Sequence, residues 1–171
     1  MNEISLLMNL LSKKGYNGQL GAPKEEILEV LGAKDKNSSI YFQKLLVQLS
    51  NYLQPIGMQI RYNPLNSYWY IRFESEISEL ISANPFEGKP SLAATLFCTL
   101  IYCLKSSGNA YISEIQKARN KKYIKDDLKE LELLGYIEIR KETEQVKLTP
   151  LIGYQLDIPR LLLNTALKVK D

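Results

Sequence analysis

The side chains that most often carry out catalysis and bind metals are scarce in this sequence. It contains no histidine and only two cysteines, Cys98 and Cys103. Without an imidazole there is no Ser-His-Asp or Cys-His arrangement, and the cysteines lack the Cys-x-x-Cys spacing of zinc and redox sites. Five residues along one helix place the two thiols about 140° apart, too far around the axis for a disulfide. We interpret both as small apolar core residues in a reducing compartment, with a redox or metal role as the alternative.

Carboxylates are the remaining candidates for acid-base chemistry, and they occur in three clusters: Glu25, Glu26 and Glu29; Asp126, Asp127, Glu130 and Glu132; and Glu138, Glu142 and Glu144. Each cluster alternates with lysines or lies at an expected exposed edge, which is typical of a solvated face. No GxxxxGK[ST] or GxGxxG motif occurs, so no standard nucleotide-binding loop is expected. The sequence therefore predicts a protein that is not an enzyme and needs no cofactor.

The composition is that of a folded protein that dissolves in water. Of the 171 residues, 45% are hydrophobic and 24% are charged, close to globular averages. The longest apolar stretch, 92–104, is shorter than the roughly 20 residues that span a membrane, and the N-terminus does not look like a secretory signal. We expect a cytoplasmic protein without membrane contact. The net charge of +3 neither establishes nor excludes nucleic-acid binding.

The first half of the chain follows the order helix, short strand, helix, helix, hairpin. Leucines at helical spacing predict a first helix that ends at Gly15, and a second helix is expected from Pro23 to Gly32. A third helix is expected from 37 to 53. Strands at 58–62 and 68–73 flank a turn of strong turn-forming residues. This order is the winged helix, a helix-turn-helix followed by a β-ribbon.

The same order returns in the second half. We expect Ser91 to cap a helix that runs to Lys105, followed by a short strand at 110–112. The spacing from Ser113 to Gln116 predicts a capping box at the next helix, and a third helix ends at Gly135. Strands at 136–140 and 145–149 complete a second hairpin.

The predicted fold class is therefore mainly α with small β-hairpins (α+β), built as two tandem winged-helix domains. Domain one spans 1–75 and domain two spans 91–156. Between them, 76–90 forms a connecting helix and a linker rich in proline and glycine. Residues 157–171 are too apolar for a solvated tail and are expected to form a docked C-terminal helix.

Basic residues gather around the second helix-turn-helix, and these are the candidate DNA contacts: Lys117, Arg119, Lys121, Lys122, Lys125 and Lys129. Asp126 and Asp127 dilute the cluster, so an ordinary solvated lysine face is the alternative interpretation. Several such contacts would give weak, salt-sensitive, non-specific DNA binding through counterion release. The third helix of the first domain has only Lys44 as a cation, which favours contact with protein.

Three segments carry more apolar residues than two small cores require: the third helix of domain one, the helix at 92–104 and the C-terminal segment. Some of this surface can join the domains, and the remainder suggests a partner helix or a second copy of the chain in a homodimer. The candidate protein-interface residues are Tyr41, Leu46, Leu96, Tyr102, Leu161, Leu162, Leu163 and Leu167.

Three segments of the second half resemble one known family. Residues 91–102, SLAATLFCTLIY, resemble LSRAALETLAIIAY; residues 111–119, YISEIQKAR, resemble ITRAEIEEIRG; and residues 124–137, IKDDLKELELLGYI, resemble SDGVLRTLLERGLI. These are motifs of the ScpB family, segregation and condensation protein B. The chain departs from them because no glycine follows Arg119, the hairpin lacks the GRP wing, and 151–167 has no counterpart. Such departures fit a divergent archaeal member.

The resemblance implies a non-catalytic accessory subunit in chromosome condensation and segregation. Such a subunit binds a ScpA-like kleisin and, through it, an SMC ATPase, often as a dimer, in the cytoplasm at the nucleoid. The alternative is a winged-helix transcription regulator that binds a defined DNA site through Arg119, Lys121, Lys122 and Lys125.

Overall fold

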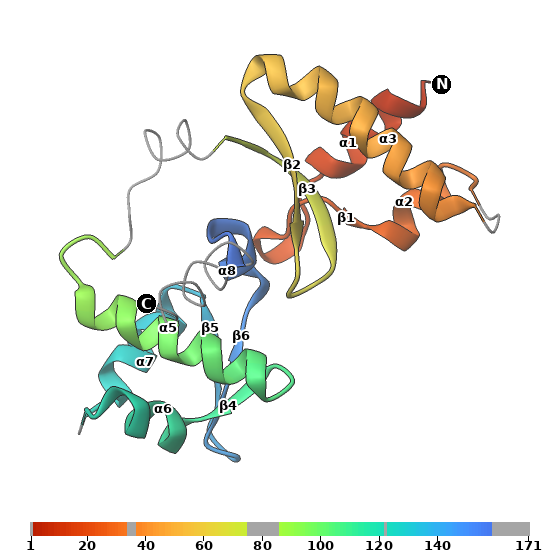
Figure 1. Ribbon diagram of the computed structural model, residues 1–171. Coiled ribbons are helices and arrows are strands. Elements are labelled where there is room, and N and C mark those ends of the chain that lie inside the picture. Colours follow the sequence, from red (N-terminus) through yellow and green to blue (C-terminus); the bar gives the residue numbers. More distant parts are fainter. Residues whose placement is uncertain (1, 34–36, 75–85, 122, 159–171) are drawn as a thin grey trace, which may run out of the picture. The chain divides into compact units, whose positions relative to one another are not determined.

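The structure is a computed structural model that describes residues 2–33, 37–74, 86–121 and 123–158 (Figure 1). The chain divides into two compact units, Met1–Ala83 together with Leu156–Asp171, and Asn84–Gln155. The connecting segment expected at 76–90 is described only from residue 86 onward, and the helix expected at 157–171 is described only at its first two residues. Each unit has its own three-stranded sheet.

The first unit contains one small sheet and three α-helices in its described part. The elements are α1 (Glu3–Ser12), η1 (Tyr16–Gly18), β1 (Ala22–Pro23), α2 (Lys24–Val30), α3 (Ser38–Leu53), η2 (Gln54–Ile56), β2 (Met58–Asn63) and β3 (Tyr68–Phe73). The sheet is antiparallel with strand order β1-β3-β2, and β2 pairs with β3 from Met58 opposite Phe73 to Asn63 opposite Tyr68. This is the helix, strand, helix, helix, hairpin order of a winged helix.

The core of this unit lies between the helices and one face of the hairpin. Its buried side chains come from α1, α2, α3 and β1: Leu7, Leu10, Leu11, Ala22, Ile27, Phe42, Leu45, Leu49 and Leu53. Trp69 of β3 covers the core, with its ring edge-to-face on Phe42 at a centroid distance of 5.5 Å. Figure 1 shows α1 and α3 beside the β2–β3 hairpin.

A glycine is required where the chain enters β1. Gly21 has a φ of +78°, and a Cβ there would lie 1.8 Å from the carbonyl oxygen of Trp69. No other residue fits this close approach of two backbones.

On β2 of the same unit, Arg61 forms an ion pair with Asp157 at 3.2 Å. Asp157, which follows the second unit in sequence, is therefore bonded to the first unit.

The second unit repeats this order and adds one helix. Its elements are α5 (Pro90–Lys105), β4 (Asn109–Tyr111), α6 (Ile112–Arg119), α7 (Lys125–Leu133), β5 (Ile137–Arg140), β6 (Gln145–Leu148) and α8 (Pro150–Gln155). The antiparallel sheet has strand order β4-β6-β5, so β5 is an edge strand. Leu92, Leu96 and Leu100 of α5 are buried with Ile115, Leu128 and Leu131 of α6 and α7.

The predicted fold class is confirmed, because both units are winged helices with more helix than strand. Two predicted helix starts are wrong. Helix α5 begins at Pro90 without a side-chain cap, and the Ser91 hydroxyl donates instead to Asp127. Helix α6 begins at Ile112, and its capping carboxylate is Glu114, which accepts from the Tyr111 amide at 3.2 Å.

Helix α8 has no counterpart among the predicted elements. It is a single short helix that follows β6, and Ile152 and Tyr154 on it are buried. The sequence offered little sign of it because Pro150–Gln155 is too short for a periodic apolar pattern. Tyr136 donates from its hydroxyl to Gln155 at 2.6 Å, so the end of α8 is tied to the residue that opens the hairpin.

Candidate functional site

A polar cluster joins the start of α5 to α6 and α7. The Asp127 carboxylate, whose side chain is 14% exposed, accepts from the Lys121 amine at 2.8 Å and from the Thr95 hydroxyl at 2.7 Å. Arg119 donates from Nε to the Thr95 hydroxyl at 3.2 Å and from its guanidinium to the Ser91 carbonyl at 3.3 Å. Thr95 is fully buried, so its hydroxyl depends on these partners.

The cluster fixes the charge state of Asp127. Burial alone would raise the pKa of its carboxyl, but the hydrogen bonds and the positive charge of Lys121, with the hydroxyls of Thr95 and Ser91, outweigh burial and lower that pKa. Asp127 is therefore charged at neutral pH, and it holds Lys121 against α5.

The cluster also accounts for two of the six predicted DNA contacts. Arg119 and Lys121 are partly buried and bonded within the second unit, so they do not form the free basic face that the sequence suggested. Lys117, Lys125 and Lys129 are exposed, whereas Lys122 lies outside the described residues. The sequence could not reveal this for Arg119, because its acceptors Thr95 and Ser91 are 24 and 28 residues away. The acceptor of Lys121, Asp127, is only six residues away, but nearness in sequence does not show that the two are bonded.

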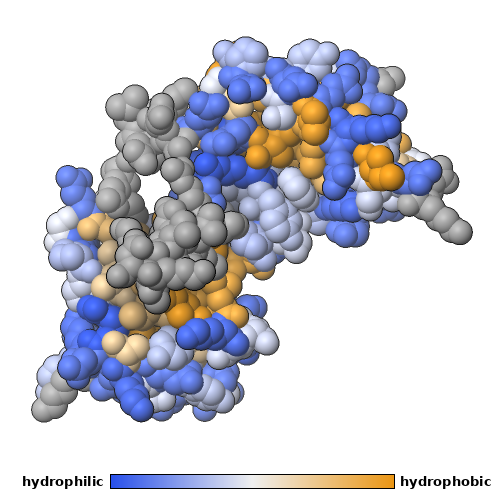
Figure 2. Space-filling model, in the orientation of Figure 1, coloured by the Kyte–Doolittle hydropathy of each residue, from blue (hydrophilic) through white to orange (hydrophobic). Residues whose placement is uncertain are grey.

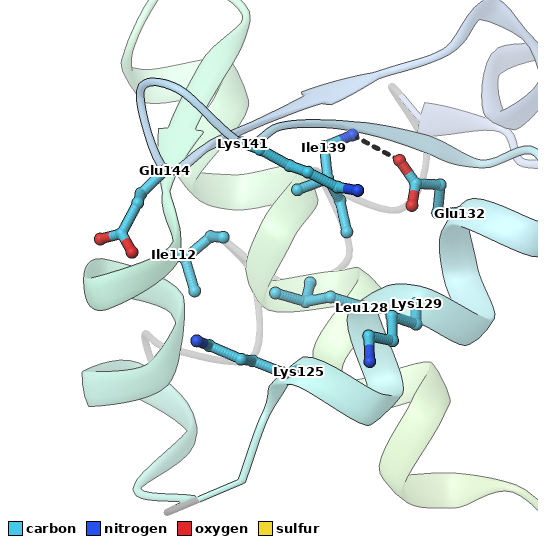
Figure 3. A pocket seen from close by; sticks show the side chains of 8 residues that line it. All are labelled: Ile112, Lys125, Leu128, Lys129, Glu132, Ile139, Lys141 and Glu144. Atoms are coloured by element: carbon cyan, nitrogen blue, oxygen red, sulfur yellow. Dashed lines mark hydrogen bonds between the residues drawn. The ribbon is translucent and has the colours of Figure 1, made fainter.

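A groove of about 350 Å³ opens between α7, the start of α6 and the β5–β6 hairpin (Figure 3). Its apolar lining is Ile112, Leu128 and Ile139, and its charged lining is Lys125, Lys129, Glu132, Lys141 and Glu144. In Figure 3 the apolar side chains lie between Lys141 on one side and Lys125 and Lys129 on the other. The groove thus combines an apolar floor with basic side chains on both walls.

One of the two carboxylates in the groove is already bonded. Glu132 accepts from the Ile139 backbone amide at 2.9 Å, along the outer edge of β5. An unpaired edge amide would otherwise invite pairing with another strand. This contact ties α7 to the hairpin and keeps the two walls of the groove together.

In the first unit, the outward face of α3 is partly apolar. Phe42, Leu45 and Leu49 are buried, and the opposite side of the helix carries Ile40 and Val47, which are 58% and 62% exposed. At 100° per residue these two lie within about 20° of each other around the axis. Lys44 is the only cation of the helix, so this face is poorly suited to phosphates and better suited to a protein surface.

The predicted protein-interface residues differ in how far they are exposed, and four of them lie outside the described residues. Tyr41 and Leu46 are partly buried and pack against the core of the first unit, at the flanks of α3. Leu96 is 3% exposed and belongs to the core of the second unit, so its prediction as a surface residue is wrong. Tyr102 is partly exposed, and the Lys105 amine lies 5.9 Å from the centre of its ring. Leu161, Leu162, Leu163 and Leu167 lie outside the described residues.

The candidate interface residues chosen from the sequence did not include Ile40 and Val47 of α3, or Leu133 of α7, which is 89% exposed. Projecting α3 onto a helical wheel with Phe42, Leu45 and Leu49 inward would have found the first two. Figure 2 shows that hydrophobic surface interrupts the hydrophilic surface of each unit on the face in view.

Within the described residues, the structure shows the exposure of the two cysteines and allows a search for metal-binding clusters and membrane-spanning helices. Cys103 is fully buried, and burial raises the pKa of its thiol to about 11, whereas Cys98 is partly exposed; both are free. Across 2–33, 37–74, 86–121 and 123–158, no cluster of three or more histidine, cysteine or acidic side chains is placed to bind a metal. No helix in the same ranges has the length and hydropathy to cross a bilayer.

Comparison with known proteins gives similar solved structures, two of which are described below, and no sequence match. No family model and no curated protein match the chain. The structure of ScpB from Mycobacterium tuberculosis is similar over 90% of this chain and 93% of its own, with 10% identity and a TM-score of 0.33. A conserved hypothetical protein from Chlorobium tepidum is similar over 87% of this chain and 91% of its own, with 15% identity and a TM-score of 0.37. The winged-helix assignment rests on the element order and strand pairing of each unit.

Proposed function

We propose that this chain is a non-catalytic accessory subunit that binds the kleisin of an SMC-type complex acting in chromosome condensation and segregation. The observation that carries the proposal is the outward face of α3. In a DNA-binding winged helix the corresponding helix enters the major groove and contacts phosphates and bases. Here that face presents Ile40 and Val47 with a single cation, Lys44. A protein partner suits it better than DNA.

The choice of a kleisin is supported by the resemblance of residues 91–137 to the ScpB family. The tandem winged-helix order is what that resemblance implies. A subunit of this kind acts in the cytoplasm at the nucleoid, where the kleisin connects it to the SMC ATPase.

The apolar face of α3 offers a moderate amount of binding free energy. Complete burial of an isoleucine or valine side chain stabilises a complex by about 1.5–3 kcal/mol. Since Ile40 and Val47 are 58% and 62% exposed, covering them would contribute about 1–2 kcal/mol each. Losing both would weaken a complex by about 30-fold or more.

Affinity purification from native cells tests the proposal. The tagged wild-type chain, treated with nuclease, should retain a kleisin and an SMC ATPase in mass spectrometry. The double variant Ile40→Asp/Val47→Asp should lose both, because two desolvated carboxylates oppose the interface. Tyr16→Asp, at a position 94% exposed in η1, is the matched control and should retain them. Equal recovery by all three proteins would count against the α3 face.

The same purification addresses the homodimer and DNA proposals. A second chain with a different tag, co-expressed with the first, should co-purify if the chain dimerises. Weak, non-specific DNA contact is favoured by Lys117, Lys125 and Lys129, which are exposed. A sequence-specific regulator is disfavoured because Arg119 and Lys121 are bonded to Thr95 and Asp127. A footprint at one defined DNA site would reverse this preference.

A further inference from the structure

The groove of the second unit has a composition that selects among ligands. Its volume of about 350 Å³ accommodates one or two side chains but not a duplex. Leu128 is buried beneath it, while Ile112 and Ile139 are only partly covered. An apolar side chain placed there would complete the covering of both isoleucines.

The charges around this floor favour carboxylates. Lys125, Lys129 and Lys141 are exposed, and they line the groove from α7 and from the hairpin. Of the two acidic residues, Glu132 is held by the Ile139 amide. Carboxylates of a ligand could therefore reach a lysine on either wall while an adjacent aliphatic side chain enters the floor.

The hairpin argues against nucleic acid as the ligand. From Ile137 to Leu148 it carries three cations and three carboxylates, Arg140, Lys141, Lys147, Glu138, Glu142 and Glu144. A wing that lies along phosphates needs an excess of cations, because each contact gains from counterion release. This wing has no excess of cations, so it offers a continuous phosphate backbone little gain from counterion release.

We infer that the groove between α7 and the β5–β6 hairpin binds an acidic peptide segment of a protein partner, with an aliphatic side chain on Ile112, Leu128 and Ile139 and flanking carboxylates at Lys125, Lys129 and Lys141. The inference rests on the proposed function in one respect, that the ligand is a protein. It names the class of segment and a contact separate from the α3 face.

Selection from a random-peptide display library on the full-length chain tests this inference. The recovered peptides should be enriched in aspartate or glutamate next to isoleucine, leucine or valine. Titration with the best peptide should shift the NMR amide signals of residues around Ile139. Affinity should fall at least about threefold in Lys125→Glu/Lys129→Glu, the effect of losing two exposed ion pairs. It should be unchanged in Lys147→Glu, an exposed lysine of the same hairpin that does not line the groove.

Three results would overturn the inference: no enrichment of acidic peptides, peptide binding that the Lys125→Glu/Lys129→Glu variant leaves unchanged, or signal shifts around Ile139 caused by a DNA oligonucleotide and by no peptide. Failure here is distinguishable from failure of the proposed function. If Ile40→Asp/Val47→Asp loses the kleisin but the full-length chain binds no acidic peptide, the proposed function stands and the peptide-binding role of the groove is wrong. Acidic-peptide binding without any kleisin in the purification would do the opposite.

Discussion

The polar cluster around Asp127 makes a quantitative prediction about the second unit. In Asp127→Ala, the buried Thr95 hydroxyl loses its acceptor and Lys121 loses its ion pair. A hydrogen bond to a charged group contributes about 1.5–3 kcal/mol, and an unsatisfied buried hydroxyl costs about 1–3 kcal/mol. Lys121 is 35% exposed and regains hydration, so its loss is smaller. We expect the free energy of unfolding of the second unit to fall by about 2–3 kcal/mol.

The chain contains its own means of separating the two units in this experiment. Its single tryptophan, Trp69, belongs to the first unit, so tryptophan fluorescence follows that unit, whereas far-UV circular dichroism follows both. In urea titrations, Asp127→Ala should move part of the dichroism transition to lower urea and leave the Trp69 transition in place.

Asp126→Ala is the matched control for this prediction. Asp126 is the adjacent acidic residue on α7 and is exposed, so its removal should change stability by no more than about 0.5 kcal/mol. Identical unfolding of Asp127→Ala and Asp126→Ala, or a Trp69 transition that shifts as much as the dichroism, would show that Asp127 does not stabilise the second unit in this way.

Three further predictions follow from other sites. Because the pKa of Asp127 is lowered in the folded state, its contribution to stability is complete above the ordinary value of 3.8 and is lost as the pH falls through the folded-state pKa. Stability of the second unit should therefore fall less steeply with acid in Asp127→Asn than in the wild type. Identical acid-unfolding profiles of the two proteins would contradict this. Gly21→Ala should destabilise the first unit by at least about 2 kcal/mol, read from the Trp69 transition, and an unchanged midpoint would contradict the positive φ and the close approach. At about pH 8 a thiol reagent should modify Cys98 well before Cys103, because the Cys103 thiol is buried and has a pKa of about 11. In Cys98→Ser, where only Cys103 remains, intact-mass analysis should show almost no adduct until urea is added. Rapid modification of this variant without urea would be inconsistent with the burial of Cys103.

Much of the fold was predictable because most helices and strands of both units have local sequence patterns, such as apolar residues at helical spacing and clusters of turn-forming residues. Phe42, Leu45, Leu49 and Leu53 recur at helical spacing, and all four are buried on α3. The turn residues between β2 and β3 also had a clear signature. Helix α8 was missed because six residues give no periodicity, and the Ser91 cap was wrong because the helix begins one residue earlier, at Pro90, so that Ser91 lies inside its first turn.

The candidate sites were less predictable, because a contact between distant residues has no local signal. Arg119 and Lys121 look like a basic patch in sequence, and only the packing of α5 against α6 and α7 brings Thr95 to Arg119 and to Asp127, the nearby partner of Lys121. Leu96 was expected at a surface because a nearly all-apolar helix gives no sign of which side faces inward. The groove beside Ile139 joins residues from three elements, so composition could not indicate it.

Photo-crosslinking in native cells can show directly whether the outward face of α3 contacts a kleisin. A photo-reactive amino acid would replace Val47, which is 62% exposed, and in a control it would replace Tyr16. After nuclease treatment, we expect a kleisin to be crosslinked from position 47 and not from position 16. Crosslinks from position 47 to DNA alone, or equal crosslinking of the kleisin from both positions, would contradict this expectation.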